Sequence, residues 1–153
     1  ITALFGHAGI EWDLTETNEQ ERAQLKSWTD YYKKNRSLIH SGKIVRVDQP
    51  DETTFVHGVV SHDQSRALFA FVQLRPATGT APASIRIEGL DPSATYRVVA
   101  EQPAGEAMFM SQKSPGWLTG AVLTGEALSR IGLRPPILAP ENAILIAIEK
   151  TKG

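Results

Sequence analysis

The chain has 153 residues, of which 22% are charged and 41% hydrophobic, with 16 Lys and Arg against 17 Asp and Glu. This length fits one domain with a sizeable hydrophobic core, and the balanced charge argues against nucleic acid as a partner. The absence of cysteine excludes disulfides, thiolate metal sites and cysteine nucleophiles.

Apolar runs in the sequence are short. The longest, 67–72 and 143–148, fall far below the roughly 20 residues that a bilayer requires, so we expect no membrane span. Residues 1–9 carry no basic segment and no small-residue cleavage signal, so we expect no secretory leader and a cytoplasmic location. The first residue is Ile1 rather than Met, which indicates a chain that begins after processing or inside a longer polypeptide.

The first predicted element is an amphipathic helix from Asn18 to about Leu38. Thr17 and Gln20 have the spacing of a capping box, which marks a helix start. Gly42 follows the helix and ends it. The apolar residues of the stripe lie mostly three or four positions apart: Leu25, Trp28, Tyr32 and Ile39.

After residue 42 the hydrophobic period changes to two. Short apolar segments alternate with turns rich in Pro, Gly, Asp and Ser, which is typical of β-sandwiches and barrels. The predicted strands are 44–47, 54–61, 66–74, 84–88, 95–101, 120–124 and 143–149. Their connections are too short for crossover helices, so the strands should be antiparallel, and the unbroken apolar run 67–72 should lie in mid-sheet. The predicted fold class is therefore mainly β: an antiparallel, Greek-key-like β-sandwich preceded by one amphipathic α-helix.

The longest stretch without a clear period runs from Pro103 to Trp117. Its Met108, Phe109 and Trp117 are candidates for a platform that stacks on a sugar ring, as in carbohydrate-binding modules. Isolated aromatic residues in loops more often pack against their own protein, so we favour a packing role. The following segment 133–137 contains two consecutive prolines, which predicts extended chain along an edge.

Candidate reactive side chains give no recognised catalytic pattern. The four histidines, His7, His40, His57 and His62, are not spaced as metal ligands, so we assign no metal site and no cofactor. His40 is explained as a cation near the negative end of the helix dipole. Ser41, Ser61 and Ser114 lack the Gly-x-Ser-x-Gly setting of a nucleophile, and residues 6–9 are too short for a phosphate-binding loop.

Glu11 and Asp13 are a possible carboxylate pair. Two residues apart in an extended segment, they point the same way, and glycoside hydrolysis uses two carboxyl groups about 5 to 10 Å apart. Asp13 is equally well placed to orient the chain that enters the helix, and Glu11 to pair with a nearby arginine. We favour this structural interpretation.

Several segments together resemble family 36 α-galactosidases. Residues 5–15 (FGHAGIEWDLT), the helix and residues 38–46 (LIHSGKIVR) are similar to the end of that family's catalytic barrel. Residues 57–60 (HGVV), 67–69, 91–92, 96–98, 118–120, 133–138 and 140–143 (PENA) are similar to its C-terminal antiparallel domain. The similarity covers nearly the whole chain.

The resemblance implies a retaining glycosidase with two catalytic Asp residues, both upstream of Ile1. No catalytic role transfers to a residue of this chain, which we expect to be inactive alone. Residues 1–41 would be the last strand-and-helix unit of the barrel and 42–153 the β-sandwich. The parent enzyme would hydrolyse terminal α-galactosides such as melibiose and raffinose.

The exposed apolar stripe of the helix must be covered. In the parent enzyme the barrel would cover it, so the rest of the parent is the expected partner. In the isolated chain the sandwich or a second copy would cover it, which predicts a homo-oligomer. Two alternative functions stay open at this point: a carbohydrate-binding module and an oligomerisation scaffold.

Overall fold

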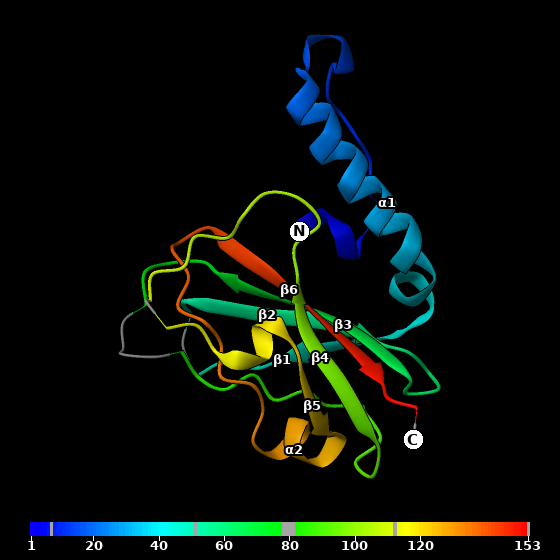
Figure 1. Ribbon diagram of the computed structural model, residues 1–153, viewed down its shortest axis with the longest axis vertical. Coiled ribbons are helices and arrows are strands. Elements are labelled where there is room, and N and C mark those ends of the chain that lie inside the picture. The colour runs from blue at the N-terminus through cyan, green and yellow to red at the C-terminus, as the bar shows by residue number, and fades with distance from the viewer. Residues whose placement is uncertain (7, 51, 78–81, 112, 153) are drawn as a thin grey trace.

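The computed structural model describes residues 1–6, 8–50, 52–77, 82–111 and 113–152. Within these residues six strands form one antiparallel sheet in the order β1-β2-β3-β6-β4-β5 (Figure 1). The strands are β1 (Lys43–Val47), β2 (Thr54–Val60), β3 (Arg66–Gln73), β4 (Thr95–Glu101), β5 (Ala121–Thr124) and β6 (Asn142–Lys150). The helices are α1 (Glu19–Ser41) and α2 (Gly125–Arg130), with the short 3-10 helices η1 (Thr2–Phe5), η2 (Leu14–Glu16) and η3 (Gly116–Thr119).

The sheet is covered on both faces, which gives the predicted layered β architecture. Beneath one face lie α2 and two extended segments, 84–90 and 131–139, which are joined by an isolated bridge between Ile85 and Leu133. The other face carries η1 and the C-terminal part of α1, while the N-terminal part of α1 projects beyond the sheet (Figure 1). The prediction of an antiparallel, mainly β fold with one long helix is confirmed.

Strand β3 lies inside the sheet between β2 and β6, as its unbroken apolar run predicted. Phe69 and Phe71 are fully buried in the larger core, beneath the extended segments. Leu68 and Ala70 point to the opposite face and pack with Leu38 and Ile39 of α1. One strand therefore contributes to both cores, and the C-terminal part of α1 is anchored to the sheet.

The start of α1 differs by one residue from the prediction. Asn18, not Thr17, is the N-cap: its side chain accepts a hydrogen bond from the Glu21 N–H, and the Glu21 side chain accepts one from the Asn18 N–H. Both Thr17–Gln20 and Asn18–Glu21 fit the capping-box pattern. Thr17 is buried and uses its hydroxyl to donate to the Leu14 carbonyl at 2.7 Å, so it is not free to cap α1.

Two elements differ from the sequence prediction in type. Segment 84–88 has the predicted alternation, with Ile85 and Ile87 buried, but it forms no ladder with the sheet. Its N–H groups at Ile85 and Ile87 donate to the carbonyls of Leu133 and Leu128 instead. The helix α2 was not predicted. Thr124 caps it by accepting a hydrogen bond from the Ala127 N–H, and Leu128 fills the core beneath the sheet.

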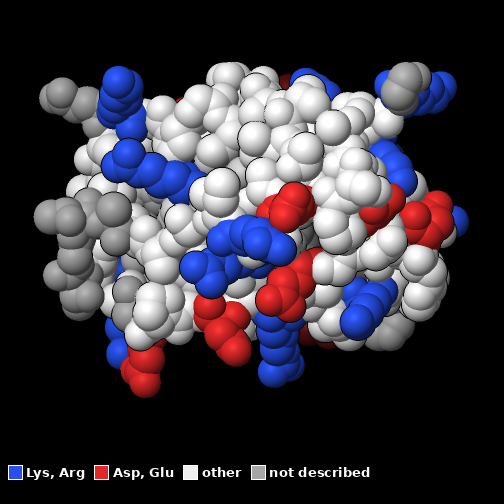
Figure 2. All heavy atoms as spheres, turned by 90° about the horizontal axis from the view of Figure 1, so that it is seen from below, with Lys and Arg blue, Asp and Glu red and all other residues white. Residues whose placement is uncertain are grey.

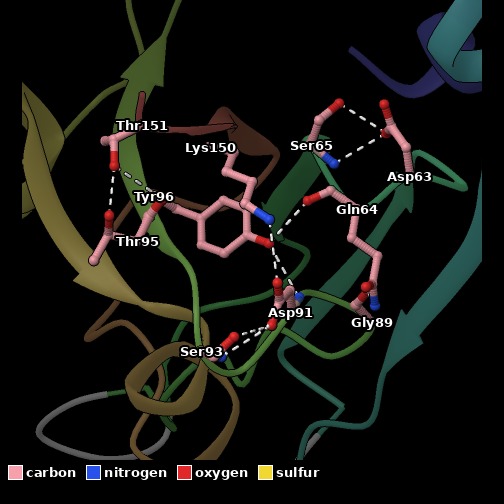
Figure 3. Close-up of polar contacts among 10 residues, drawn as sticks. All are labelled: Asp63, Gln64, Ser65, Gly89, Asp91, Ser93, Thr95, Tyr96, Lys150 and Thr151. Atoms are coloured by element: carbon pink, nitrogen blue, oxygen red, sulfur yellow. Dashed lines mark hydrogen bonds and ion pairs between the residues drawn. The ribbon is translucent and has the colours of Figure 1, made fainter. Parts of the chain in front are cut away.

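The fully buried Tyr96 joins two turns at one end of the sheet (Figure 3). Its hydroxyl donates to the Gln64 carbonyl at 2.8 Å and accepts from the Asp91 N–H at 3.0 Å. The Asp91 carboxylate also pairs with Lys150 of β6 at 3.1 Å. The turn around Gln64, the turn around Asp91 and the end of β6 are thus held together through one phenol and one ion pair.

Charges of both signs lie on the face of the molecule seen from below (Figure 2). Figure 2 shows Lys and Arg side chains interspersed with Asp and Glu side chains on the face seen from below, without a patch of one sign. Among the helices of the described residues, none has the length and apolar character needed to cross a bilayer. The expectation that the chain does not bind nucleic acid stays a prediction.

Candidate functional site

The histidines are dispersed. His57 lies on β2 between the rings of Phe5 and Phe55, with centroid distances of 4.6 and 5.0 Å, and burial lowers its pKa. His40 forms a 2.7 Å hydrogen bond with the Tyr32 hydroxyl. His7 lies outside the described residues. Within the part of the chain that the structure describes, no three His, Asp or Glu residues are grouped as a metal ion would require.

The two carboxylates of the candidate pair have different surroundings. Asp13 is the N-cap of η2, where its Oδ1 accepts hydrogen bonds from the Thr15 N–H at 2.9 Å and the Thr15 hydroxyl at 2.6 Å. These hydrogen bonds lower the pKa of Asp13. Glu11 is exposed to solvent. Asp13 thus accepts hydrogen bonds within its own turn, which favours its ionised form and agrees with the structural interpretation.

The residues considered for an aromatic platform differ in their exposure to solvent. Trp117 is 8% exposed in the core beneath the sheet, and its Nε1 donates to the Arg134 carbonyl at 2.7 Å. It packs, as we favoured, and cannot present a face to a sugar. Phe109 and Met108 remain on the surface. Gln112, in the same segment, lies outside the described residues.

The largest exposed apolar feature near the N-terminus lies beside α1. Ile10, Trp12 and Leu14 are each about half exposed, and they lie at alternate positions of the segment that leads into η2. Next to them an open groove of about 430 Å³ runs between this segment and α1, and its apolar lining includes Leu25 and Trp28. We call this groove together with Ile10, Trp12 and Leu14 the N-terminal apolar surface. Such a surface indicates contact with another polypeptide.

The sequence predicted only part of this surface. The helix stripe was recognised, and Leu25, Trp28 and Tyr32 do line the groove together. The contribution of Ile10, Trp12 and Leu14 was not predicted. The available signal was their close spacing, three large apolar residues within positions 10–14 just before the amphipathic helix.

Polar contacts fix α1 against the sheet below the groove. The Tyr31 hydroxyl donates to the Glu101 carboxylate at the end of β4, and burial, aided by this hydrogen bond, raises the pKa of Tyr31. Asn35 accepts a 3.1 Å hydrogen bond from Arg66 of β3, which also lies 3.5 Å from Glu149 of β6. The orientation of α1, and with it the groove, is therefore set by three strands.

A family model described as the glycosyl hydrolase family 36 C-terminal domain matches residues 54–146. An α-galactosidase of Escherichia coli is 40% identical over 98% of the chain, which spans 22% of that relative. The chain belongs to glycosyl hydrolase family 36. The resemblance seen in the sequence is thereby confirmed.

Solved structures of family 36 agree with this assignment. The α-galactosidase of Lactobacillus brevis superposes with a TM-score of 0.77 over 99% of this chain, at 26% identity, and the match covers 19% of that protein. The α-galactosidase AgaB of Geobacillus stearothermophilus has the same fold, with a TM-score of 0.76 at 23% identity over 97% of this chain. This family 36 protein chain therefore spans about a fifth of the length of the relatives that it matches.

Proposed function

We propose that the chain is the C-terminal portion of an α-galactosidase and that it supports a catalytic barrel encoded upstream without having activity of its own. In this proposal residues 1–41 complete the barrel and 42–153 form the domain that braces it. The parent enzyme would release terminal α-galactose from sugars such as melibiose and raffinose by a retaining mechanism, in the cytoplasm. The observation that carries the proposal is the N-terminal apolar surface.

This surface is suited to a large apolar partner. The C-terminal turns of α1 already pack on the sheet through Leu38 and Ile39, whereas the groove around Leu25 and Trp28 stays open. Ile1 lines the same groove, so polypeptide continuing upstream would leave the domain at that point. The family 36 relatives have about four-fifths of their length elsewhere, which supplies a partner of sufficient size.

Trp12 gives a sharp test. It is half exposed and belongs to neither hydrophobic core of the chain, so Trp12→Glu should change the unfolding free energy of the isolated chain by less than about 0.5 kcal/mol. In the parent enzyme the same change removes a buried indole and buries a charge, which should cost about 3 kcal/mol or more. Thermal melting of both proteins, with α-galactosidase activity of the parent on an aryl α-galactoside, measures the difference.

Ile131→Glu is the matched control. Ile131 is 71% exposed at the end of α2, below the sheet and away from the groove, so its replacement should be neutral in both proteins. Equal effects of Trp12→Glu in the chain and the parent would count against the proposal, as would turnover of the aryl galactoside by the isolated chain.

A second copy of the chain is the competing occupant of the N-terminal apolar surface. It would be identified by a dimeric mass in solution that becomes monomeric in the isolated Trp28→Glu variant. Trp28 lines the groove and is only partly buried, so this replacement should affect the N-terminal apolar surface more than the hydrophobic core. This measurement of mass in solution tests the prediction of a homo-oligomer.

A further inference from the structure

A smaller groove lies at the far end of β4, on the opposite side of the sheet from the larger groove. It has a volume of about 240 Å³ and lies between the start of β6 and the loop that follows β4. Ala100, Ala107 and Ile144 form an apolar floor, Phe109 stands at one side, and Gln102 and Glu106 stand at the rim. We call it the Phe109 groove.

Hydrogen bonds hold the backbone on both sides of Phe109, whose side chain is 42% exposed. The Met108 N–H donates to the Asn142 side chain at 2.9 Å, and the Ala139 N–H donates to the Met108 carbonyl at 2.9 Å. On the other side the Met110 N–H donates to the Ile137 carbonyl at 2.8 Å. Hydrogen bonds on both sides fix the backbone that carries the ring before any ligand arrives, which lowers the backbone entropy lost on binding.

The rim supplies unused hydrogen-bond acceptors. Among the described residues, neither Gln102 nor Glu106 has a hydrogen-bond or ion-pair partner, whereas Glu101 nearby is engaged by Tyr31. A free carboxylate and a free amide beside an apolar floor match a ligand that has hydroxyl groups on its edge and carbon on its face. Charge-assisted hydrogen bonds from hydroxyls to Glu106 would be the stronger of these contacts.

We propose that the Phe109 groove binds a single pyranose residue, stacked on the Phe109 ring and hydrogen-bonded to Glu106 and Gln102. The groove is smaller than the roughly 300–1,000 Å³ pockets that hold drug-sized ligands, which limits it to one sugar residue. A protein partner is less well matched, because a stable interface buries about 800 Å² on each side and the exposed apolar residues at this edge are few: Met108, Phe109 and Met110.

The test is a titration of the isotopically labelled chain, followed by NMR through its backbone amides. Methyl α-galactoside and raffinose are the probes, a choice that rests on the proposed function, and sorbitol is the control because it has hydroxyls without a ring face. We expect saturable shifts confined to residues 100–109 and 142–146, with roughly millimolar affinity. Sorbitol should produce no saturable shift.

Three variants locate the site. Phe109→Ala should weaken binding about tenfold through loss of stacking, and Glu106→Ala, which alters only an exposed side chain, should weaken it to a similar extent. Phe55→Ala is the matched control, because Phe55 is also 42% exposed but lies on the face that carries α1. It should bind the galactosides as the unmodified chain does.

Several results would overturn the proposal. They are the absence of saturable shifts, equal shifts with sorbitol, unchanged affinity in both groove variants, or a change of oligomeric mass in Phe109→Ala without any sugar binding. The last would assign the surface to a contact between copies of the chain. The titration measures binding and does not depend on turnover. A negative titration would therefore not contradict the proposed role in the parent enzyme. In the same way, an inactive parent enzyme would not change how the titration is interpreted.

Discussion

Replacing Tyr96 by Phe tests the packing argument at the end of the sheet. The substitution keeps the fully buried ring and removes only the hydroxyl, which joins the Gln64 carbonyl to the Asp91 N–H (Figure 3). Both groups then lose a partner in a confined setting. A net hydrogen bond contributes about 0.5–1.5 kcal/mol, and a buried polar group left unsatisfied costs about 1–3 kcal/mol. We therefore expect a loss of about 2–3 kcal/mol.

Urea and thermal unfolding of the isolated chain measure this loss. For a chain of this size about 1 kcal/mol corresponds to roughly 2–4 °C, so the melting temperature should fall by about 4–12 °C. Tyr32→Phe is the control, because its hydroxyl bonds to the exposed His40, and removing it should cost less than about 0.5 kcal/mol. If the two variants unfolded at the same urea concentration, the role assigned to Tyr96 would be refuted.

Two further substitutions probe the sheet. In Gly58→Ala the added Cβ would lie 2.4 Å from the Leu68 carbonyl oxygen and 2.5 Å from the Phe69 ring, so we expect a loss of about 3 kcal/mol or insoluble protein. Near-native stability would show that β2 can move away from β3. Burial lowers the pKa of His57 below 6.5, so the folded state binds fewer protons than the unfolded state, and stability should be lost as pH falls through that range. Urea midpoints at about pH 7.5 and pH 5 should therefore differ more for the unmodified chain than for His57→Gln, and parallel changes would contradict this reasoning.

Where local signals and tertiary packing agreed, the sequence predicted the structure closely. The helix stripe predicted α1, and the apolar run 67–72 predicted a strand inside the sheet, as β3 is. Segment 84–88 shows the limit of this reasoning. Its alternation fixed which side chains are buried but not its hydrogen-bond partner, because Leu133, some fifty residues further on, is brought beside it only by the fold.

The candidate site was harder to predict than the fold. A tryptophan in a segment without a clear period can belong to a binding surface or to a packed core, and the burial of Trp117 together with its hydrogen bond to the Arg134 carbonyl shows that it packs. The Phe109 groove is made from the ends of β4 and β6 and the loop between β4 and η3. No local pattern reports that these distant segments meet.

The last strand of the chain has a consequence for biosynthesis. β6 lies between β3 and β4, and its hydrogen bonds join the two halves of the sheet. Until β6 has left the ribosome, the nascent polypeptide can form only the separate fragments β1-β2-β3 and β4-β5, with unpaired edges and exposed apolar side chains. A truncation before residue 142 would therefore remove the element that unites the domain, and chaperone dependence should be greatest until β6 has been made.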